Sequence, residues 1–407
     1  MAKPHLRFYV HAGAFVAVLA VVGLSAIHSP KIFSVEYDRT LVGDVDKKET
    51  NIPPEPKKVE PQGVVVTHLP TPEPVKAIYM SQCVVGTPSF RAKLVEVADT
   101  TEINSIIIDI KDFSGRLGFN TENPKLKASV SDTCRAGDIV SFIDFLHKKN
   151  IYVIGRITVF QDPFMSNLRP DLAVRKISDG GVWKDHKGLS FIDVGAKEHW
   201  EYIAEISRES YKLGFDELNF DYIRFPSDGD MKDTSYTLSQ GRSKPEALEE
   251  FFKYLSSQLK PEGIIISADL FGMVTTNRDD LNIGQVLERA LPYFDYIAPM
   301  VYPSHYPKTF NGWSDPNKYP YELIKYVMTS AVNRANEFDR SFGTTSPQYS
   351  ANSYKKLRPW LQDFDYGGTY DIPEVRAQIR GTYDAGLTSW MLWAPSNIYT
   401  KGALEQN

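Results

Sequence analysis

From Ala77 onward, short β-rich runs alternate with amphipathic stretches of helical spacing. Eight runs are predicted to be strands: Ala77–Ser81, Ser105–Lys111, Tyr152–Val159, Asp216–Phe225, Ile264–Phe271, Asp295–Tyr302, Arg340–Gln348 and Thr388–Pro395. The stretches between them predict helices over Phe90–Ala98, Asp138–Lys148, Lys197–Lys212, Glu246–Leu259, Ile283–Ala290, Tyr321–Asn336 and Pro373–Ala385. Strands that alternate with helices pair in parallel, because a parallel neighbour needs a crossover connection. Eight such units predict an α/β fold, a (β/α)8 TIM barrel.

An open doubly wound sheet is the alternative architecture. It usually has fewer strands and a glycine-rich phosphate-binding turn, and no turn of that form occurs in this sequence. Little chain follows Asn397, so the eighth helix is expected to be short or missing.

The N-terminal residues predict a membrane anchor that precedes the barrel. Residues 1–7 include Lys3 and Arg7, and residues 8–27 carry no formal charge over about the length that crosses a bilayer. This run is long for a secretory signal, whose apolar core has roughly 7–15 residues, so we predict a retained transmembrane signal anchor. A cleaved signal is the alternative. The preceding basic residues favour a cytoplasmic N-terminus, a single-pass chain and an extracytoplasmic barrel at the cell membrane.

Residues 28–75 have the composition of a stalk, with eight prolines among lysines, acids and threonines. Such a segment buries too little apolar surface to fold, so we predict a disordered linker before a barrel domain over residues 76–407. The chain has two cysteines, Cys83 and Cys134. In an oxidising compartment they can form one disulfide, and two separate buried thiols are the alternative.

The overall charge argues against a nucleic-acid partner. The formal net charge is −5, and no cluster of Lys and Arg with interleaved aromatic residues stands out. The eight histidines are scattered and form no paired motif on any predicted strand, so neither a metal site nor a cofactor is predicted.

Two acids fall where the active site of such a barrel lies, at the carboxyl ends of the strands. Asp221 ends the fourth predicted strand and Asp269 the fifth, both within apolar sequence. Glycoside hydrolysis needs two carboxyls, one ionised beside an oxocarbenium-like centre and one that protonates the leaving oxygen. We therefore predict Asp221 and Asp269 as the catalytic pair, with Asp221 ionised through charge pairing with Arg156 or Arg224.

Other polar and aromatic residues at the same strand ends are predicted to bind the sugar. They are Asp109, Lys111, Arg156, Asn219, Arg224, Tyr302 and Trp393. Aromatic side chains offer flat apolar faces with polar edges, which suit sugar rings. Asp109 has a structural alternative, which is to hold Arg156, and Arg224 can also pair with a loop carbonyl. Asp216 and Glu217 come early in their strand and are expected to be structural.

Six motifs between Ala77 and Tyr399 resemble those of a bacterial family of glycoside-hydrolase-like proteins known as DUF4015: IIIDIKD, VIGRITVFQDP, FDELNFDYIRFP, ISADLFG, DYIAPMVYPSHY and TSWMLWAPSNIY. The resemblance implies a TIM barrel and a glycosidase-like activity. More distantly, MVYP and WMLW are similar to strands of family 18 chitinases, whose fourth strand ends in a catalytic Glu. Here the row reads Glu217, Asn219, Asp221, and Ile223 is expected at the next inward position. Substrate-assisted chitinolysis is therefore not expected.

The predicted function is an O-glycosyl hydrolase that acts on an oligo- or polysaccharide of the cell wall or of an exopolysaccharide. Two alternatives stay open. One is a non-catalytic glycan-binding barrel at the cell surface, and the other is a metal-dependent polysaccharide hydrolase or deacetylase with an Asp-rich site. The sequence does not determine the oligomeric state, the sugar or the linkage.

Overall fold

The computed structural model describes residues 65–342 and 352–407. The predicted cytoplasmic N-terminus, the predicted anchor and residues 28–64 of the predicted linker lie outside the described residues. Among the helices that are described, none combines the length and the apolar character needed to span a bilayer.

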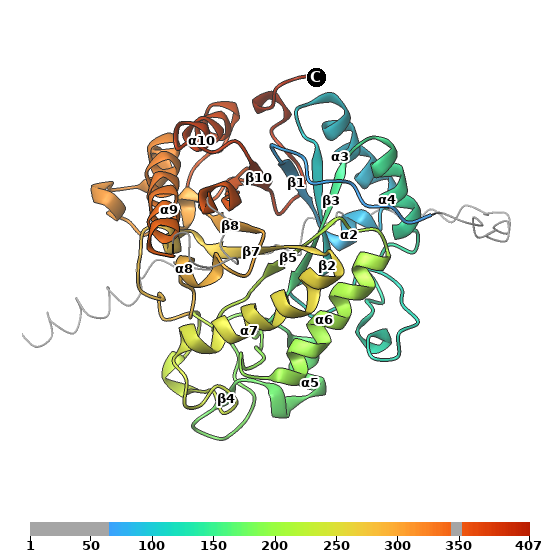
Figure 1. Cartoon of the computed structure of the whole chain (residues 1–407), viewed down its shortest axis with the longest axis vertical. Coiled ribbons are helices and arrows are strands. Elements are labelled where there is room, and N and C mark those ends of the chain that lie inside the picture. The colour runs from blue at the N-terminus through green and yellow to red at the C-terminus, as the bar shows by residue number, and fades with distance from the viewer. Residues whose placement is uncertain (1–64, 343–351) are drawn as a thin grey trace, which may run out of the picture. The chain divides into compact units, whose positions relative to one another are not determined.

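Eight parallel strands close into a barrel (Figure 1). They are β1 (Lys76–Met80), β2 (Ser105–Lys111), β3 (Tyr152–Thr158), β5 (Glu217–Asp221), β7 (Ile265–Phe271), β8 (Tyr296–Met300), β9 (Trp360–Gln362) and β10 (Trp390–Trp393). Their order around the barrel is β1-β10-β9-β8-β7-β5-β3-β2. Each barrel strand therefore pairs with the barrel strands before and after it in the chain, and β1 pairs with β10. Because the sheet closes on itself, the TIM barrel is confirmed and the open sheet is excluded.

The prediction for the seventh strand is wrong. Arg340 to Phe342 end the long helix α9 (Pro320–Phe342), and the rest of the predicted strand lies outside the described residues. The strand that completes the barrel is β9, which has three residues. A strand this short shows no alternation of apolar and polar residues, so the sequence pattern does not reveal it.

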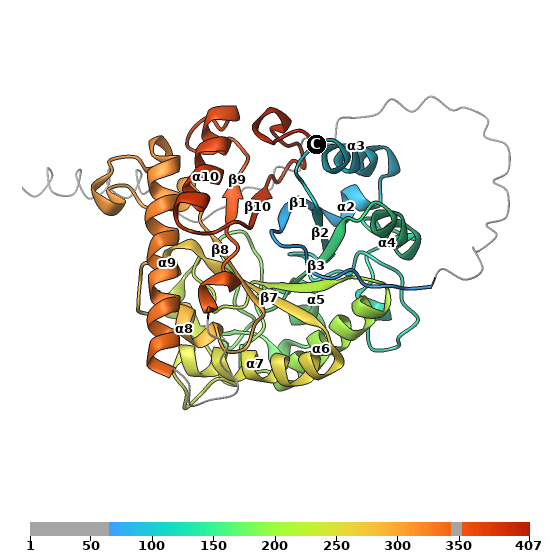
Figure 2. The same ribbon diagram turned by 45° about the horizontal axis from the view of Figure 1, so that its top comes forward.

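Helices surround the barrel, as the two views in Figures 1 and 2 show. They are α2 (Gln82–Val85), α3 (Pro88–Thr100), α4 (Ile139–Lys148), α5 (Pro163–Leu168), α6 (Lys197–Lys212), α7 (Lys244–Leu259), α8 (Leu287–Ala290), α9 and α10 (Ile372–Asp384). Each predicted helix has a counterpart, although α8 keeps only the last turn of its predicted range. In α7 the apolar residues Leu248, Phe251, Phe252 and Leu255 follow helical spacing and are buried. After β10, the described chain forms only a 3-10 turn, Lys401–Ala403.

Alternation along each strand divides the apolar residues of the barrel strands between two hydrophobic clusters. Leu218 and Phe220 of β5 belong to the larger cluster, which includes the buried faces of the outer helices. Tyr79, Trp360 and Trp393 belong to a smaller cluster with inward residues of the barrel. At the early end of β5, Glu217 pairs with Arg358 at 3.1 Å, and both side chains are almost fully buried. As expected from its early position, Glu217 is structural.

Two long connections follow β3 and β5 and are joined by a small antiparallel pair, β4 (Arg175–Lys176) with β6 (Thr234–Ser235). Asp193 accepts hydrogen bonds from the N–H groups of Gly195 and Leu238, at 3.0 and 2.8 Å, and thereby links the two connections. Since both connections leave the carboxyl ends of their strands, they hold the chain segments beside the barrel mouth in place.

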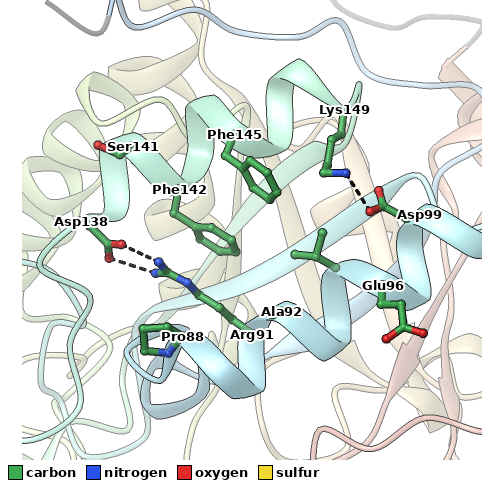
Figure 3. A pocket seen from close by; sticks show the side chains of 11 residues that line it. Pro88, Arg91, Ala92, Glu96, Asp99, Asp138, Ser141, Phe142, Phe145 and Lys149 are labelled. Atoms are coloured by element: carbon green, nitrogen blue, oxygen red, sulfur yellow. Dashed lines mark hydrogen bonds and ion pairs between the residues drawn. The ribbon is translucent and has the colours of Figure 1, made fainter. Parts of the chain in front are cut away.

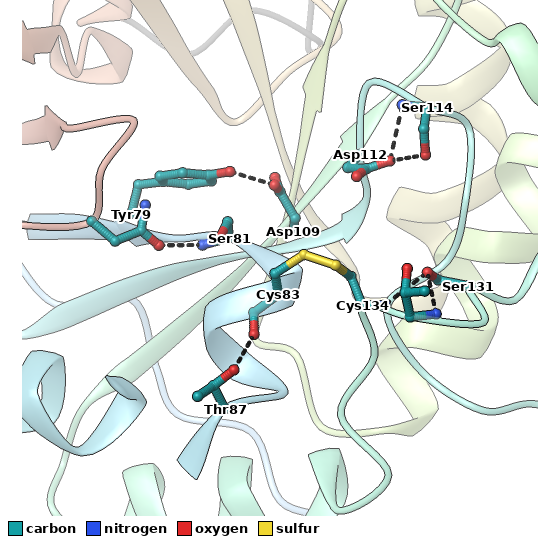
Figure 4. The surroundings of a disulfide bond; sticks show 11 residues. Tyr79, Ser81, Cys83, Thr87, Asp109, Asp112, Ser114, Ser131 and Cys134 are labelled. Carbon is teal, nitrogen blue, oxygen red and sulfur yellow. Dashed lines mark hydrogen bonds between the residues drawn. A yellow bond between two sulfur atoms is a disulfide. The ribbon is translucent and has the colours of Figure 1, made fainter. Parts of the chain in front are cut away.

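The two cysteines form a disulfide, which decides between the two alternatives that the sequence left open. Cys83 lies in α2, directly after β1, and Cys134 lies in the loop between β2 and α4 (Figure 4). The bond closes a loop across 51 positions of the sequence. It therefore ties the connection after β2 to the carboxyl end of β1.

We expect removal of this bond to lower the free energy of unfolding by about 2–4 kcal/mol, because the unfolded chain regains the entropy of the open loop. The measurement is urea unfolding of the wild type and of Cys83→Ser. A reducing agent should lower the wild-type midpoint to that of the variant and leave the variant unchanged. Equal midpoints for the oxidised wild type and the variant would contradict the expectation.

Candidate active site

The guanidinium of Arg156 lies among three inward carboxyls at the carboxyl end of the barrel. The carboxyls belong to Asp109, Asp221 and Asp269, and these four side chains are called the carboxylate cluster. Arg156 Nη1 donates to Asp109 Oδ1 at 2.7 Å, and Nε donates to Asp221 Oδ2 at 3.2 Å. Nη2 also donates to Asp221 Oδ2. Nε lies 3.9 Å from Asp269 Oδ2. The structure thus brings together four of the predicted site residues, from the adjacent strands β2, β3, β5 and β7.

The register of the strands explains this convergence. Asp109 stands beside Arg156 across the β2–β3 pair, and Arg156 stands beside Asn219 across the β3–β5 pair. Inward residues of neighbouring parallel strands form a layer, so side chains at equal heights meet inside the barrel. Asp221 is two residues further along β5 and reaches the same guanidinium from above Asn219.

The surroundings push the pKa values of two of these acids upward. Burial raises the pKa of Asp109 to about 6, against the opposing effect of Arg156. Burial also raises the pKa of Asp269 well above its usual range, and the nearby Asp221 carboxylate raises it further. A single guanidinium does not compensate three buried carboxylates, and the raised pKa values of Asp109 and Asp269 favour the protonated forms of these two acids.

Asp269 is held by two donors on the same oxygen. Asn219 Nδ2 donates to Oδ1 at 2.9 Å, and Trp360 Nε1 donates to Oδ1 at 2.8 Å. Since Oδ1 accepts both hydrogen bonds, the proton of the neutral acid belongs on Oδ2, the oxygen nearest Arg156. Trp360 was not predicted as a site residue, because it begins the short strand β9 that the sequence pattern missed.

Aromatic rings form one wall of this cluster. The Tyr79 hydroxyl donates to Asp109 Oδ2 (Figure 4), and the Tyr79 ring stacks on Trp393 with centroids 4.1 Å apart. The Trp393 ring also lies 5.1 Å from the centre of the Arg156 guanidinium. Tyr302, a further predicted site residue, is buried in the same hydrophobic cluster as Trp393. Tyr79 was missed because it reads as an ordinary apolar residue of its strand.

The backbone immediately after Asp221 is strained. Tyr222 has a φ of 52°, in the left-handed region that residues other than glycine seldom adopt, and its N–H donates to Asp221 Oδ1 at 2.6 Å. Backbone conformations of this kind cost about 1–3 kcal/mol and cluster at functional sites. The turn also ends β5 at Asp221, so Ile223 does not continue the inward row. It belongs instead to the larger cluster with the outer helices, which corrects the expectation from strand alternation.

Lys111 does not join the cluster. Its side chain is fully buried, and Nζ pairs with Asp162 at 2.8 Å and donates to the carbonyl of Thr158 at 2.7 Å. The ammonium therefore ties the end of β2 to the connection after β3. Since its donors are directed to these buried partners, the structure does not place Lys111 where the sequence predicted it to bind the sugar. Arg224 lies beside the cluster and donates to the carbonyl of Phe225 at 3.0 Å.

A family model described as "Putative glycosyl hydrolase domain", DUF4015, matches residues 77–399. The chain belongs to this family. The match spans all eight barrel strands except the first residue of β1, and it includes every residue of the carboxylate cluster. At the level of the family, membership supports a glycan hydrolase. No curated protein matches the chain.

Two solved structures show the same fold as this DUF4015 barrel. The glycoside hydrolase domain of PgaB (BpsB) from Bordetella bronchiseptica is 14% identical, with a TM-score of 0.55 over 82% of this chain and 99% of that chain. The alpha-L-fucosidase isoenzyme 2 from Paenibacillus thiaminolyticus is 11% identical, with a TM-score of 0.51 over 81% and 48%. A hypothetical protein from Ruminiclostridium thermocellum ATCC 27405 is 33% identical over 51% of this chain and 98% of that chain, with a TM-score of 0.43.

A surface groove of about 470 Å³ lies between α3 and α4, on the outside of the DUF4015 barrel (Figure 3). Phe142 and Phe145 line it, and ion pairs of Arg91 with Asp138 and of Lys149 with Asp99 lie along it. None of the residues that line this groove belongs to the carboxylate cluster. The groove is therefore separate from the candidate active site.

We expect Arg156→Gln to lower the free energy of unfolding by about 3–5 kcal/mol at neutral pH, because it leaves buried carboxylates without their cation. Arg156 lowers the pKa values of Asp109 and Asp269, so these two pKa values should rise further without it. The loss should therefore shrink as the pH falls and these two acids gain protons. Urea unfolding at several pH values measures both effects. Arg376→Gln on the surface of α10 is the control, with an expected change within about 0.5 kcal/mol. A pH-independent loss would contradict this electrostatic account.

Proposed function

We propose that this barrel is an extracytoplasmic glycoside hydrolase that cleaves a cell-wall or exopolysaccharide glycan with Asp221 and Asp269. One observation carries the proposal: the two acids come from adjacent strands and contact the same guanidinium, but their surroundings differ. Asp221 accepts two charge-assisted hydrogen bonds from Arg156, whereas Asp269 accepts bonds from an amide and an indole and has a raised pKa.

This difference matches the two roles that glycoside hydrolysis requires. Asp269 retains a proton and delivers it to the leaving oxygen. Asp221 stays ionised and stabilises or attacks the oxocarbenium-like centre. Arg156 fixes the position of Asp221, and the strained turn at Tyr222 adds an N–H donor to the same carboxylate.

Access to the two acids differs as well. Asp221 is 6% exposed and Asp269 is 1% exposed, so Asp221 is the acid nearer to an incoming sugar. The proposal therefore requires side chains above Asp269 to move when a sugar ring enters. Catalytic hydrogen bonds often take their final geometry only with substrate bound.

The location is proposed from two features. The apolar run at residues 8–27, with basic residues before it, supports a membrane anchor with the barrel outside the cytoplasm. The disulfide between Cys83 and Cys134 supports an oxidising compartment.

A non-catalytic glycan-binding barrel is the second candidate, and the deep burial of Asp269 favours it. The metal-dependent alternative has less support. In the described part of the chain, no group of three His, Cys, Asp or Glu side chains is arranged to hold a metal ion. The guanidinium of Arg156 lies among the three carboxyls, where it would repel a cation.

We expect Asp221→Asn and Asp269→Asn each to lower glycan hydrolysis by about 10²–10⁴-fold, because each removes one of the two carboxyl functions. The assay is the release of reducing ends from a panel of cell-wall glycans and exopolysaccharides. Asp132→Asn is the control, since that carboxylate is 88% exposed in a surface ion pair. If the wild type binds a glycan without cleaving it, and Asp221→Asn loses that binding, the glycan-binding candidate replaces the enzyme.

The pH dependence of hydrolysis should identify the proton donor. Asp269 acts as an acid only while protonated, so kcat/KM should fall as the pH rises through its raised pKa. Trp360→Phe removes a hydrogen bond that favours the ionised form, and should therefore move this alkaline limb to higher pH. Steady-state rates over a pH series measure the shift. An unchanged limb in Trp360→Phe would assign the titrating group to another residue.

A further inference from the structure

The guanidinium of Arg224 lies beside the carboxylate cluster and donates to uncharged acceptors. Its Nη1 donates to the carbonyl of Phe225 at 3.0 Å and to Ser227 Oγ at 3.2 Å. Within residues 65–342 and 352–407, no carboxylate lies at ion-pair distance from Arg224. The residue is half-buried, so part of its surface is open to a ligand.

Three aromatic rings surround this guanidinium. Its central carbon lies 4.9 Å from the ring of Phe271, 5.3 Å from that of Tyr222 and 5.9 Å from that of Phe191. Cation–π contacts of this kind offset part of the cost of removing a cation from water. The offset is incomplete, since burial lowers the pKa of Arg224 below its usual value. The site therefore favours a group that supplies negative charge and hydrogen-bond acceptors.

The acids nearest to Arg224 have partners of their own. Asp221 contacts Arg156, and Asp185 accepts from the N–H groups of Lys187 and Leu189 at 2.9 and 2.8 Å. Asp228 lies 3.8 Å from the imidazole of His186. All three act on Arg224 only at longer range. None of them neutralises the guanidinium by direct contact.

The position of Arg224 relates it to the proposed reaction. Tyr222 follows Asp221 directly, and Phe271 stands two residues after Asp269 on β7. A guanidinium that contacts both rings lies between the carboxyl ends of β5 and β7. A sugar substituent held there would belong to the ring at the two acids or to its immediate neighbour.

We propose that Arg224 binds the carboxylate of an acidic sugar, so that the substrate is a uronate-containing glycan. The proposal rests on the assignment of this site to glycan hydrolysis. The planar guanidinium fork matches the geometry of a carboxylate, and Nη1 is already fixed by two acceptors, which orients the remaining donors. A neutral sugar would leave this cation without a counter-charge.

The test is calorimetric binding with the full-length protein and matched pairs of oligosaccharides. The acidic probes are oligogalacturonates and oligomannuronates, and the neutral probes are the same oligomers after reduction of their carboxyl groups. Sulfated neutral oligosaccharides show whether any anion suffices. The variants are Arg224→Gln, Arg224→Lys and the control Arg376→Gln, which removes the same charge from the outer surface of α10.

We expect the wild type to bind at least one acidic oligomer more tightly than its reduced form, and Arg224→Gln to weaken that binding by about 10- to 100-fold. Arg224→Lys should recover only part of the loss, because an ammonium lacks the fork. Arg376→Gln should bind as the wild type does. Equal binding of acidic and neutral probes, preference for the sulfated probe, or an unchanged Arg224→Gln would overturn the proposal.

Binding and cleavage separate this inference from the proposed function. Acidic oligomers that bind through Arg224 and are never cleaved would leave the inference standing and remove the hydrolase assignment. Cleavage of a neutral glycan at the same rate by wild type and Arg224→Gln would do the reverse.

Discussion

The candidate site depends on one electrostatic constraint, the single guanidinium of Arg156 among the carboxyls of Asp109, Asp221 and Asp269. Three ionised acids in a barrel interior would repel one another, and one cation does not compensate them. This repulsion is reduced because each acid has different surroundings in the barrel. Asp221 takes the closest contacts with Arg156, and burial raises the pKa of the other two. The arrangement that keeps the interior stable also prepares the acids for separate chemical roles.

The supporting structure keeps that arrangement in register. Parallel neighbours bring inward residues to equal heights, and the closed barrel leaves them little room to move apart. Trp360 and Asn219 hold Asp269 through hydrogen bonds to its Oδ1, and the turn at Tyr222 holds Asp221 at the end of its strand. Lys111 contributes from outside the cluster, because its pair with Asp162 anchors the connection after β3.

The sequence predicted the barrel well because its signal is repeated. Seven of the eight strands fall inside their predicted segments, apart from the first residue of β1, since each of these segments contains several β-branched or aromatic residues. The exception is β9, which has three residues and lies after a 23-residue helix. A strand this short has no local pattern that predicts it. Because β9 was not predicted, Trp360 was not predicted as a site residue either. Arg224 shows a different limit, because the sequence offered Asp221 or a carbonyl as its partner and only the structure shows the carbonyl.

The sequence by itself determined which residues face the barrel interior, because alternation along a strand is a local property of the chain. It thereby identified Asp109, Arg156, Asn219, Asp221 and Asp269 as neighbours at the carboxyl ends of their strands. Only the tertiary structure decided which acid Arg156 contacts most closely, that Lys111 points into an internal ion pair, and that Arg224 donates to a carbonyl and a hydroxyl. These outcomes depend on the heights and distances of side chains from separate strands. Such distances are set by barrel closure and loop packing, which no single segment encodes.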